Sequence, residues 1–273
     1  MSVRLAHLSD PHFGSERITV MCELCRTLKR LAPDLIVLSG DITQRARRSQ
    51  FIAARRFLAN LRPTPVLVVP GNHDIPLFNV LARWRWPYRK YQRVLGAALA
   101  PDVSLHGVRL IGFNSAPPWR HKNGELDSSH VARQLATLNG AAPLRVAVLH
   151  HPLDCRLPSD ERNLLLLGQR LLQVFSDHDV DLVLGGHIHD PFVTLSSRRY
   201  PQLPRPMILA VAGTCVSQRT RPEIPNSFNF ITLEPSEPAT QTLERWDMAG
   251  GEFESVACNR FIREPGTGWL PLH

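Results

Sequence analysis

The sequence predicts an α/β fold in which helices and two β-sheets form a layered sandwich. Over the first two-thirds of the chain, short runs of Val and Leu alternate with amphipathic segments, a pattern typical of buried parallel strands joined by helices. In the last third, strand-like runs follow one another with little helix between them. The chain has 273 residues, 43% of them hydrophobic, and can bury a large core without disulfides. We therefore expect two sheets covered by helices.

The expected elements follow in chain order. In the first two-thirds, strands are predicted at 3–8, 35–38, 66–69, 145–149 and 182–184, and helices at 19–31, 49–61, 127–138 and 161–176. In the last third, strands are predicted at 192–195, 207–212, 228–233 and 240–245. The sequence contains no internal repeat and no low-complexity linker, so we expect a single domain over 1–273, with a cap-like insertion around 76–100.

The net charge and the cysteine content indicate which partners and which cellular compartment to expect. The net charge is +8, from 32 Lys and Arg against 24 Asp and Glu, which favours anionic partners: nucleic acid, an acidic membrane surface or phosphorylated small molecules. Arg4, His7 and Asp10 interrupt the apolar residues at the N-terminus, so no export signal is expected. The five cysteines are scattered and odd in number, unlike a disulfide framework. Together these features predict a cytoplasmic protein.

Each of five predicted buried strands is followed by Asp, Asn or His. In open α/β sheets, ligands bind at the carboxyl ends of the strands, so side chains that are far apart in sequence should converge there. Glycines in these segments allow sharp turns and close approach. The five segments are Asp10-Pro11-His12, Gly40-Asp41, Gly71-Asn72-His73-Asp74, His150-His151-Pro152 and Gly185-Gly186-His187-Ile188-His189-Asp190.

The chemistry of these side chains indicates a pair of metal ions. Imidazole, carboxylate and amide oxygen suit divalent Zn, Mn or Fe without a thiolate. Seven such groups exceed one four-coordinate site but suit two sites that share a carboxylate. Two ions about 3.5–4 Å apart can hold a bridging hydroxide and stabilise an in-line phosphoryl displacement.

The ordered series DPH, GD, GNHD, HHP and GGHIH resembles that of the calcineurin-like metallophosphoesterase superfamily. It runs from Asp10 to His189, about two-thirds of the chain. The stretches GDITQRARRSQF, PVLVVPGNHDIP and PNSFNFITLE are most similar to the bacterial branch that holds cyclic-nucleotide phosphodiesterases and glycerophosphodiesterases. The resemblance implies a four-layer α/β/β/α sandwich with two mixed β-sheets.

The resemblance also implies a role for each site residue. Asp41 would bridge the two ions, and His73 would stabilise or protonate the departing oxygen, in agreement with the general need for a proton donor at a leaving alkoxide. In the HHP motif the implied ligand is His150, which leaves His151 as a supporting or substrate-facing residue or as surface. The first ion would be held by Asp10, His12 and His189, and the second by Asn72, His150 and His187.

One stretch departs from the pattern of protein Ser/Thr phosphatases, which carry GDxVDRG after the second strand. Here Gln44 replaces the Asp and Ala46 replaces the last Gly, although Arg45 matches. The acidic partner that would orient His73 is therefore absent, and Asp74 or a backbone carbonyl is left to take its place. Arg45 is expected either to contact phosphate or to be solvated.

The segment 83–93 reads RWRWPYRKYQR and contains five basic residues and no acid. Three interpretations stay open: a structural cap, a grip on a nucleotide or other anionic substrate, or a peripheral contact with an acidic membrane. The polar loop 119–124 is a further candidate, either to overhang the pocket or to lie in solvent.

The expected activity is that of a dinuclear metal-dependent phosphoric ester hydrolase with Mn, Fe or Zn. A phosphodiesterase acting on a cyclic nucleotide, a glycerophosphodiester or a phospholipid-type diester is favoured. The alternatives are a pyrophosphatase on a nucleotide-linked lipid at the inner membrane surface, a nuclease, and a non-catalytic scaffold on the same fold. Nucleic acid is the less favoured partner because no dedicated nucleic-acid module is present in the sequence. The oligomeric state stays open.

Overall fold

The first sheet is built around β1, whose neighbours come from opposite ends of the chain. In the computed structural model, which describes residues 1–137 and 143–272, β1 pairs in parallel with β2 and antiparallel with β10. The order is β13-β12-β11-β10-β1-β2-β3, so the sheet is mixed. Its strands are β1 (Val3–Leu8), β2 (Leu35–Ser39), β3 (Val66–Val69), β10 (Ser227–Glu234), β11 (Thr240–Ala249), β12 (Glu252–Glu264) and β13 (Gly268–Pro271).

The second sheet is also mixed, with the order β4-β5-β6-β7-β9-β8. Its four central strands run parallel to one another, and β4 and β8 pair antiparallel at the two edges. The strands are β4 (Asp102–Leu105), β5 (Val108–Gly112), β6 (Leu144–Val148), β7 (Leu182–Gly185), β8 (Phe192–Leu195) and β9 (Ile208–Val211).

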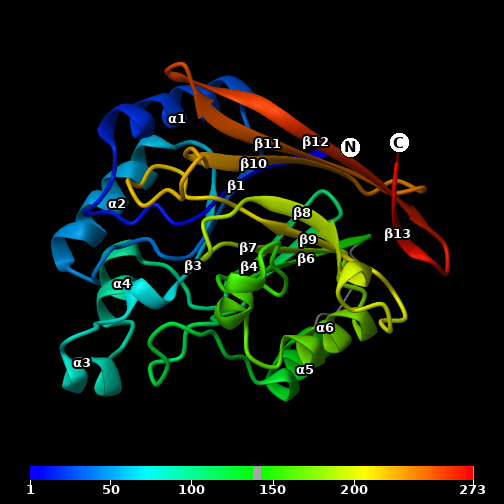
Figure 1. Cartoon of the computed structure of the whole chain (residues 1–273), viewed down its shortest axis with the longest axis horizontal. Coiled ribbons are helices and arrows are strands. Elements are labelled where there is room, and N and C mark those ends of the chain that lie inside the picture. Colours follow the sequence, from blue (N-terminus) through cyan, green and yellow to red (C-terminus); the bar gives the residue numbers. More distant parts are fainter. Residues whose placement is uncertain (138–142, 273) are drawn as a thin grey trace.

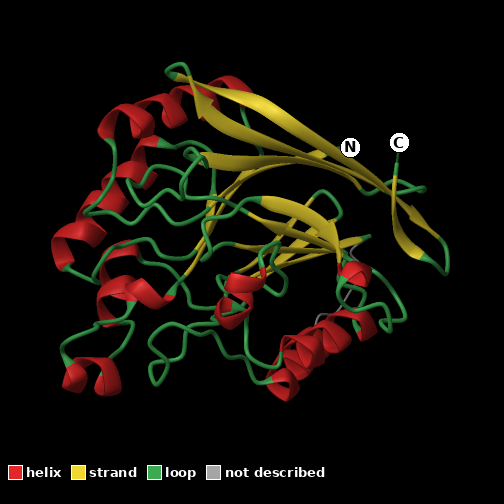
Figure 2. Ribbon diagram, in the orientation of Figure 1, coloured by secondary structure: helices red, strands yellow, loops and turns green. Residues whose placement is uncertain are grey.

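Helices cover the outer face of each sheet, which gives the expected four-layer α/β/β/α sandwich (Figure 1). Figure 2 shows the two sheets between the helices, with loops gathered at one end. The α-helices are α1 (Ile18–Leu31), α2 (Arg48–Asn60), α3 (Val80–Arg85), α4 (Arg89–Leu95), α5 (Ser128–Ala136) and α6 (Gly168–Asp177). Short 3₁₀ helices lie at Asn72–Asp74, Pro158–Asn163 and Ser196–Arg198.

Strand alternation builds three apolar layers. Leu5 and Val37 point between the sheets and pack with residues such as Leu184 of the second sheet. Their neighbours Leu8 and Ile36 point the other way, onto α1 and α2. The second sheet likewise buries its outer face under α5 and α6. Because both faces of these strands are buried, their sequences read as continuous apolar runs, and the expected two-sheet architecture is confirmed.

The predicted helix over 161–176 is wrong in its first half. The chain forms a 3₁₀ turn to Asn163, then runs extended, and α6 begins only at Gly168. The reason is tertiary: the backbone N–H groups of Leu165 and Leu166 donate to the carbonyls of Pro152 and Gly124 rather than to a helix.

Other differences lie in segments that the sequence left unassigned. The strands β4, β5, β12 and β13 were not predicted, nor were α3 and α4 within the segment 76–100. The predicted helix 127–138 ends at Ala136, and its last residue lies outside the described residues.

Candidate metal centre

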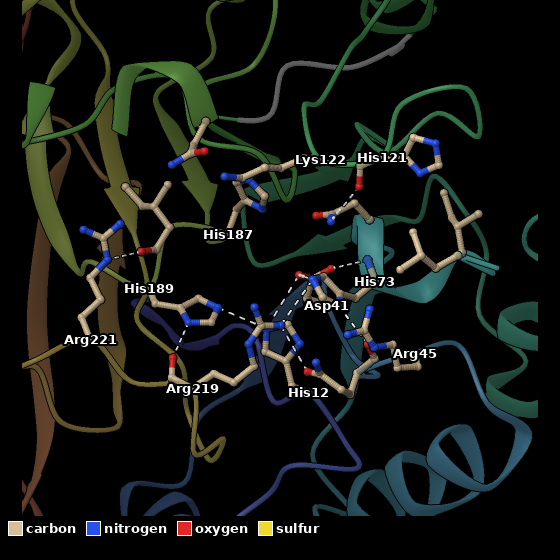
Figure 3. A pocket seen from close by; sticks show the side chains of 16 residues that line it. His12, Asp41, Arg45, His73, His121, Lys122, His187, His189, Arg219 and Arg221 are labelled. Carbon is tan, nitrogen blue, oxygen red and sulfur yellow. Dashed lines mark hydrogen bonds and ion pairs between the residues drawn. The ribbon is translucent and has the colours of Figure 1, made fainter. Parts of the chain in front are cut away.

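The five polar segments meet where strands of both sheets end. Asp10 and His12 follow β1, Asp41 follows β2, and Asn72 and His73 follow β3. The second sheet contributes the segment after β6 and the segment after β7. Figure 3 shows His12, Asp41, His73, His187 and His189 around one pocket.

Asp10, His12 and His189 form one compact group, with their ligand atoms all within 4.8 Å of one another. The Nε2 atoms of His12 and His189 lie 3.1 Å apart, and His189 Nε2 lies 3.2 Å from Asp10 Oδ1. Two ring nitrogens and a carboxylate oxygen that point at one place are donors of the kind that bind a borderline divalent ion.

Asp41 lies between this group and a second one. Its Oδ2 is 3.7 Å from His12 Nε2, and its Oδ1 is 3.3 Å from His150 Nε2. Asp41 also joins groups of mutually close ligand atoms with His12 and His73, and with Asp10 and His150. A carboxylate with one oxygen toward each group is placed as a bridge would be.

Three buried atoms in the second group have no hydrogen-bond partner: Asn72 Oδ1, His150 Nε2 and His187 Nε2. A buried polar atom without a partner costs about 1–3 kcal/mol, and the ligand atoms of His150 and His187 lie within 4.8 Å of each other, so these atoms call for a common partner. The Asn72 oxygen is an acceptor that can bind a cation, and so is a ring nitrogen of a neutral histidine. Together with Asp41, these residues therefore fit a second divalent ion.

The backbone at the site is held in an uncommon conformation. Asp10, His12, Asp41, His187 and His189 all have positive φ, between 44° and 71°. Non-glycine residues at positive φ cost roughly 1–3 kcal/mol each and persist where the surrounding structure over-determines them. Strain at five residues of one site is typical of a functional constraint.

Burial and mutual charge set the protonation of the site. Burial alone would raise the pKa of Asp10, but His189, His12 and His150 outweigh it and hold that pKa well below its usual range. Burial lowers the pKa of His12 to about 4 and that of His187 well below its usual value. His150 is the exception. Burial alone would lower its pKa, but the Asp41 carboxylate outweighs burial and raises the pKa of His150 to about 9.

The two histidines of the HHP motif have different surroundings. His150 Nδ1 donates to the carbonyl of Ser39 at 2.8 Å, which leaves Nε2 toward the site. His151 is buried rather than on the surface, and both of its ring nitrogens have partners: Ser115 Oγ and the carbonyl of Lys122. His151 thus lies next to the proposed ligand His150 and connects it by a hydrogen bond to the loop 119–124.

His73 is oriented by a backbone group. Its Nδ1 donates to the carbonyl of Gln44 at 2.9 Å, so the backbone takes the place that an acidic side chain would have held. Asp74 does not contact the ring. Its carboxylate accepts N–H groups from Ile42, Thr43 and Gly71 and braces the loop after β2.

The site opens into a cavity of about 420 Å³. His121 and Lys122 of the loop 119–124 line it, so the overhang interpretation is correct. Sequence reasoning missed Asn163, Arg219 and Arg221, which also line the cavity. Arg219 lies in the loop between β9 and β10, where no motif marks it, and its carbonyl accepts from His189 Nδ1 at 2.5 Å.

Comparison with known proteins identifies the family. A sequence model described as calcineurin-like phosphoesterase (Metallophos) matches residues 3–191. The chain belongs to this family. Its members are phosphoesterases, so the protein is a hydrolase of phosphoric esters, and its His and Asp clusters are candidate metal-binding groups.

Two curated relatives are named as phosphodiesterases. Glycerophosphodiester phosphodiesterase GpdQ of Enterobacter lignolyticus is 28% identical over 221 residues, which cover 70% of this chain and 76% of the relative. A probable cyclic nucleotide phosphodiesterase of Synechococcus is 27% identical over 211 residues, covering 76% of this chain and 75% of the relative. These names agree with the branch that the sequence motifs indicate.

Solved structures show the same fold. A dimetal phosphatase from Danio rerio superposes with a TM-score of 0.61 at 14% identity, covering 93% of this chain and 98% of that chain. A purple acid phosphatase from yellow lupin gives a TM-score of 0.63 at 13% identity, and this chain spans 53% of its length. At these identities the likeness is one of fold.

Proposed function

We propose that the protein is a dinuclear metal-dependent phosphodiesterase. One observation carries the proposal: one oxygen of Asp41 faces His12 of the Asp10 group and the other faces His150, which belongs to a set of residues with buried, unpartnered polar atoms. In the proposed arrangement Asp10, His12 and His189 hold one ion, Asn72, His150 and His187 hold the other, and Asp41 contacts both. When bound, the ions (Mn, Fe or Zn) would act as Lewis acids on the phosphate and lower the pKa of the attacking water.

The chain's own residues would orient the ester and handle the leaving group. Because the Gln44 carbonyl accepts the Nδ1–H of His73, the other ring nitrogen, Nε2, is directed toward the cavity and lies 4.0 Å from Asp41 Oδ2. In the proposed mechanism this Nε2 donates a proton to the departing oxygen. His121, through its carbonyl, accepts from Asn72 Nδ2 at 3.3 Å and keeps the amide oxygen turned toward the second ion.

The proposed substrates are phosphodiesters of small molecules: cyclic nucleotides, glycerophosphodiesters or phospholipid-type diesters. The names of the two curated relatives support the first two classes. A scaffold without activity is less supported, since His and Asp side chains that could bind metal ions surround the site. Nucleic acid is less supported because the sequence contains no dedicated nucleic-acid module.

A nucleotide-linked lipid is a second candidate substrate, and an exposed surface favours it. Phe78, Leu81 and Trp84 are exposed to 84%, 72% and 66%, and we call these residues, with Val80 and Trp86, the α3 patch. The segment 75–101 contains no acid, and Arg85 and Arg89 lie over the Trp86 ring at 5.7 and 5.5 Å. Exposed aromatics flanked by Arg are typical of segments that rest on an acidic membrane.

The structure changes which residues of 83–93 could make that contact. Arg83 is buried, and its guanidinium donates to the carbonyls of Pro76 and Pro118 at 3.0 and 2.5 Å. Tyr91 is buried as well. The proposed peripheral contact is therefore made by the α3 patch, next to Leu77 at the cavity wall, and we propose that 76–100 acts as a cap.

No helix among the described residues is long and apolar enough to cross a bilayer. We propose a cytoplasmic protein that reaches the inner membrane surface through the α3 patch.

Metal analysis combined with an assay tests the proposed activity. Purified protein is expected to bind close to two Mn, Fe or Zn ions per chain and to hydrolyse bis(4-nitrophenyl) phosphate, with loss of activity on chelation and recovery on adding Mn. Protein that binds no such ion and cleaves no ester would refute the proposal.

A further inference from the structure

We propose that the cavity contains a second anion-binding subsite, formed by Arg219 and Arg45, for a phosphate or carboxylate that the substrate carries in addition to its scissile phosphodiester. The inference rests on the proposed function and narrows its substrate class. Three features support the subsite: the fixed position of Arg219, the lack of carboxylate partners for both arginines among the described residues, and the charge balance of the cavity.

Both the backbone and the side chain of Arg219 are held by hydrogen bonds. Its carbonyl accepts from His189 Nδ1, and its N–H donates to Ser217 Oγ at 3.1 Å, so its backbone is part of the site (Figure 3). Its Nη1 lies 3.2 Å from Gln44 Oε1 and 3.3 Å from His73 Nε2. The guanidinium is thus pre-positioned beside the residue proposed to act on the leaving group, which lowers the entropic cost of binding an anion there.

Arg45 lines the same cavity. Its guanidinium lies over the Phe78 ring, 5.8 Å from the centroid. In the described part of the chain, neither Arg45 nor Arg219 forms an ion pair with a carboxylate. Ile75 and Leu77 also line the cavity and offer an apolar surface for the body of a substrate.

Arg221 lines the same cavity but has a structural role, and it differs from Arg45 and Arg219 in its partners. Both of its terminal nitrogens bond to the Asp160 carboxylate, at 2.7 and 2.8 Å, and its Nε donates to the carbonyl of Ile188. Its charge is neutralised and its side chain is fixed. Arg45 and Arg219 have no such neutralising partner among the described residues, so their charge is available to a ligand.

The charge balance favours a substrate with more than one negative charge. Four cationic side chains line the cavity: Arg45, Lys122, Arg219 and Arg221. Asp160 neutralises Arg221, and Asp41, the carboxylate that lines the cavity, lies between the two metal-binding groups. A simple phosphodiester carries one negative charge. Arg45, Lys122 and Arg219 form no ion pair with a carboxylate among the described residues, and their charge matches a substrate with a further phosphate or carboxylate.

Two chromogenic esters that differ by one phosphate test the subsite. Thymidine 5′-(4-nitrophenyl phosphate) and its 3′-phosphorylated form release the same leaving group. The wild-type enzyme with Mn is expected to prefer the 3′-phosphorylated ester in kcat/KM. Arg219→Gln should lower kcat/KM for that ester by about 10- to 100-fold, the effect of losing a charge-assisted hydrogen bond, and lower it much less for the plain ester.

Matched controls separate this role from others. Arg48→Gln removes an exposed arginine of α2 outside the cavity and should leave both rates unchanged. Binding of thymidine 3′,5′-bisphosphate to metal-free protein, followed by calorimetry, should weaken in Arg219→Gln and in Arg45→Gln but not in Arg48→Gln.

Three outcomes would overturn the subsite: a wild-type preference for the plain ester, equal losses on both esters in Arg219→Gln, or cleavage of bis(4-nitrophenyl) phosphate with neither thymidine ester turned over. Equal losses would assign Arg219 to the positioning of His73 alone. Failure to cleave any of the three esters would instead refute the proposed phosphodiesterase.

Discussion

His73 is held by the backbone of Gln44, with 2.9 Å between His73 Nδ1 and the Gln44 carbonyl oxygen. The side chain of Gln44 is turned to Arg219 instead. Orientation of the histidine therefore does not depend on an acid at position 44, and the departure from the protein-phosphatase motif is compatible with an intact site.

Replacing His73 should affect the chemical step alone. We expect His73→Ala to lower kcat on bis(4-nitrophenyl) phosphate by about 10²- to 10⁴-fold, the range for loss of a general acid, with metal content and circular dichroism unchanged. Gln44→Ala keeps the carbonyl and should cause a far smaller loss. Comparable losses in both variants would contradict the backbone role.

Asp41 should be needed for metal binding. Asp41→Asn removes the negative charge shared by His12 and His150, so we expect at least one ion per chain to be lost in mass-spectrometric metal analysis, together with most of the activity. Glu254→Gln changes an exposed acid of β12 and should retain both ions. Full metal content in Asp41→Asn would argue against a bridging role.

Metal uptake should release a proton from His150. The Asp41 carboxylate outweighs the effect of burial and raises the pKa of His150 to about 9, so the ring is protonated at pH 7 in the metal-free protein and must become neutral to bind an ion. The apparent affinity for Mn should therefore rise with pH up to about 9. Calorimetry in two buffers of different ionisation enthalpy should give about one proton released, and a value of zero would contradict this protonation state.

The two adjacent glycines at the end of β7 should differ in their tolerance of a methyl group. A Cβ at Gly186 would lie 1.9 Å from Ser9 Oγ and 2.5 Å from Asp10 Oδ2, whereas a Cβ at Gly185 would have its nearest neighbour at 3.6 Å. Gly186→Ala should displace Asp10 and reduce metal binding and activity, while Gly185→Ala should retain both. Equal metal content in the two variants would contradict the prediction that a methyl group at position 186 disturbs the Asp10 ligand.

Membrane contact through the α3 patch can be tested with vesicles. Wild-type protein should sediment with phosphatidylglycerol vesicles at low salt and much less with phosphatidylcholine vesicles, because the flanking arginines favour an anionic surface. Leu81→Ser with Trp84→Ala should abolish sedimentation and leave hydrolysis of a soluble ester unchanged. Val256→Ser, at an exposed apolar position of β12, serves as the control. Binding that the double variant retains would refute this contact.

The sequence was most informative where one physical rule applies to a whole segment. Strands buried on both faces, such as β2 and β7, read as unbroken apolar runs, and the polar residues after them converge because parallel strands end at the same edge. For the same reason the two-sheet fold and the grouping of Asp10, Asp41 and His187 could be expected from the order of the motifs.

Features that depend on long-range contacts could not be read in this way. The strand β12 is largely exposed, so it lacks an apolar run, and the break before α6 arises from hydrogen bonds to distant carbonyls. Arg219 reaches His73 from a loop 146 positions further along the chain, and no local pattern marks an arginine in such a loop.

The site draws on both sheets, which has a consequence for assembly. Asp10 and Asp41 come from the first sheet and His150 and His187 from the second, and the facing sides of the two sheets pack through an apolar core. Ions held by all four would cross-link the layers as a covalent bridge does, so the metals would stabilise the sandwich as well as serve the reaction. Thermal unfolding of this protein should therefore report its metal content, and hydrolysis should begin only after both sheets have docked.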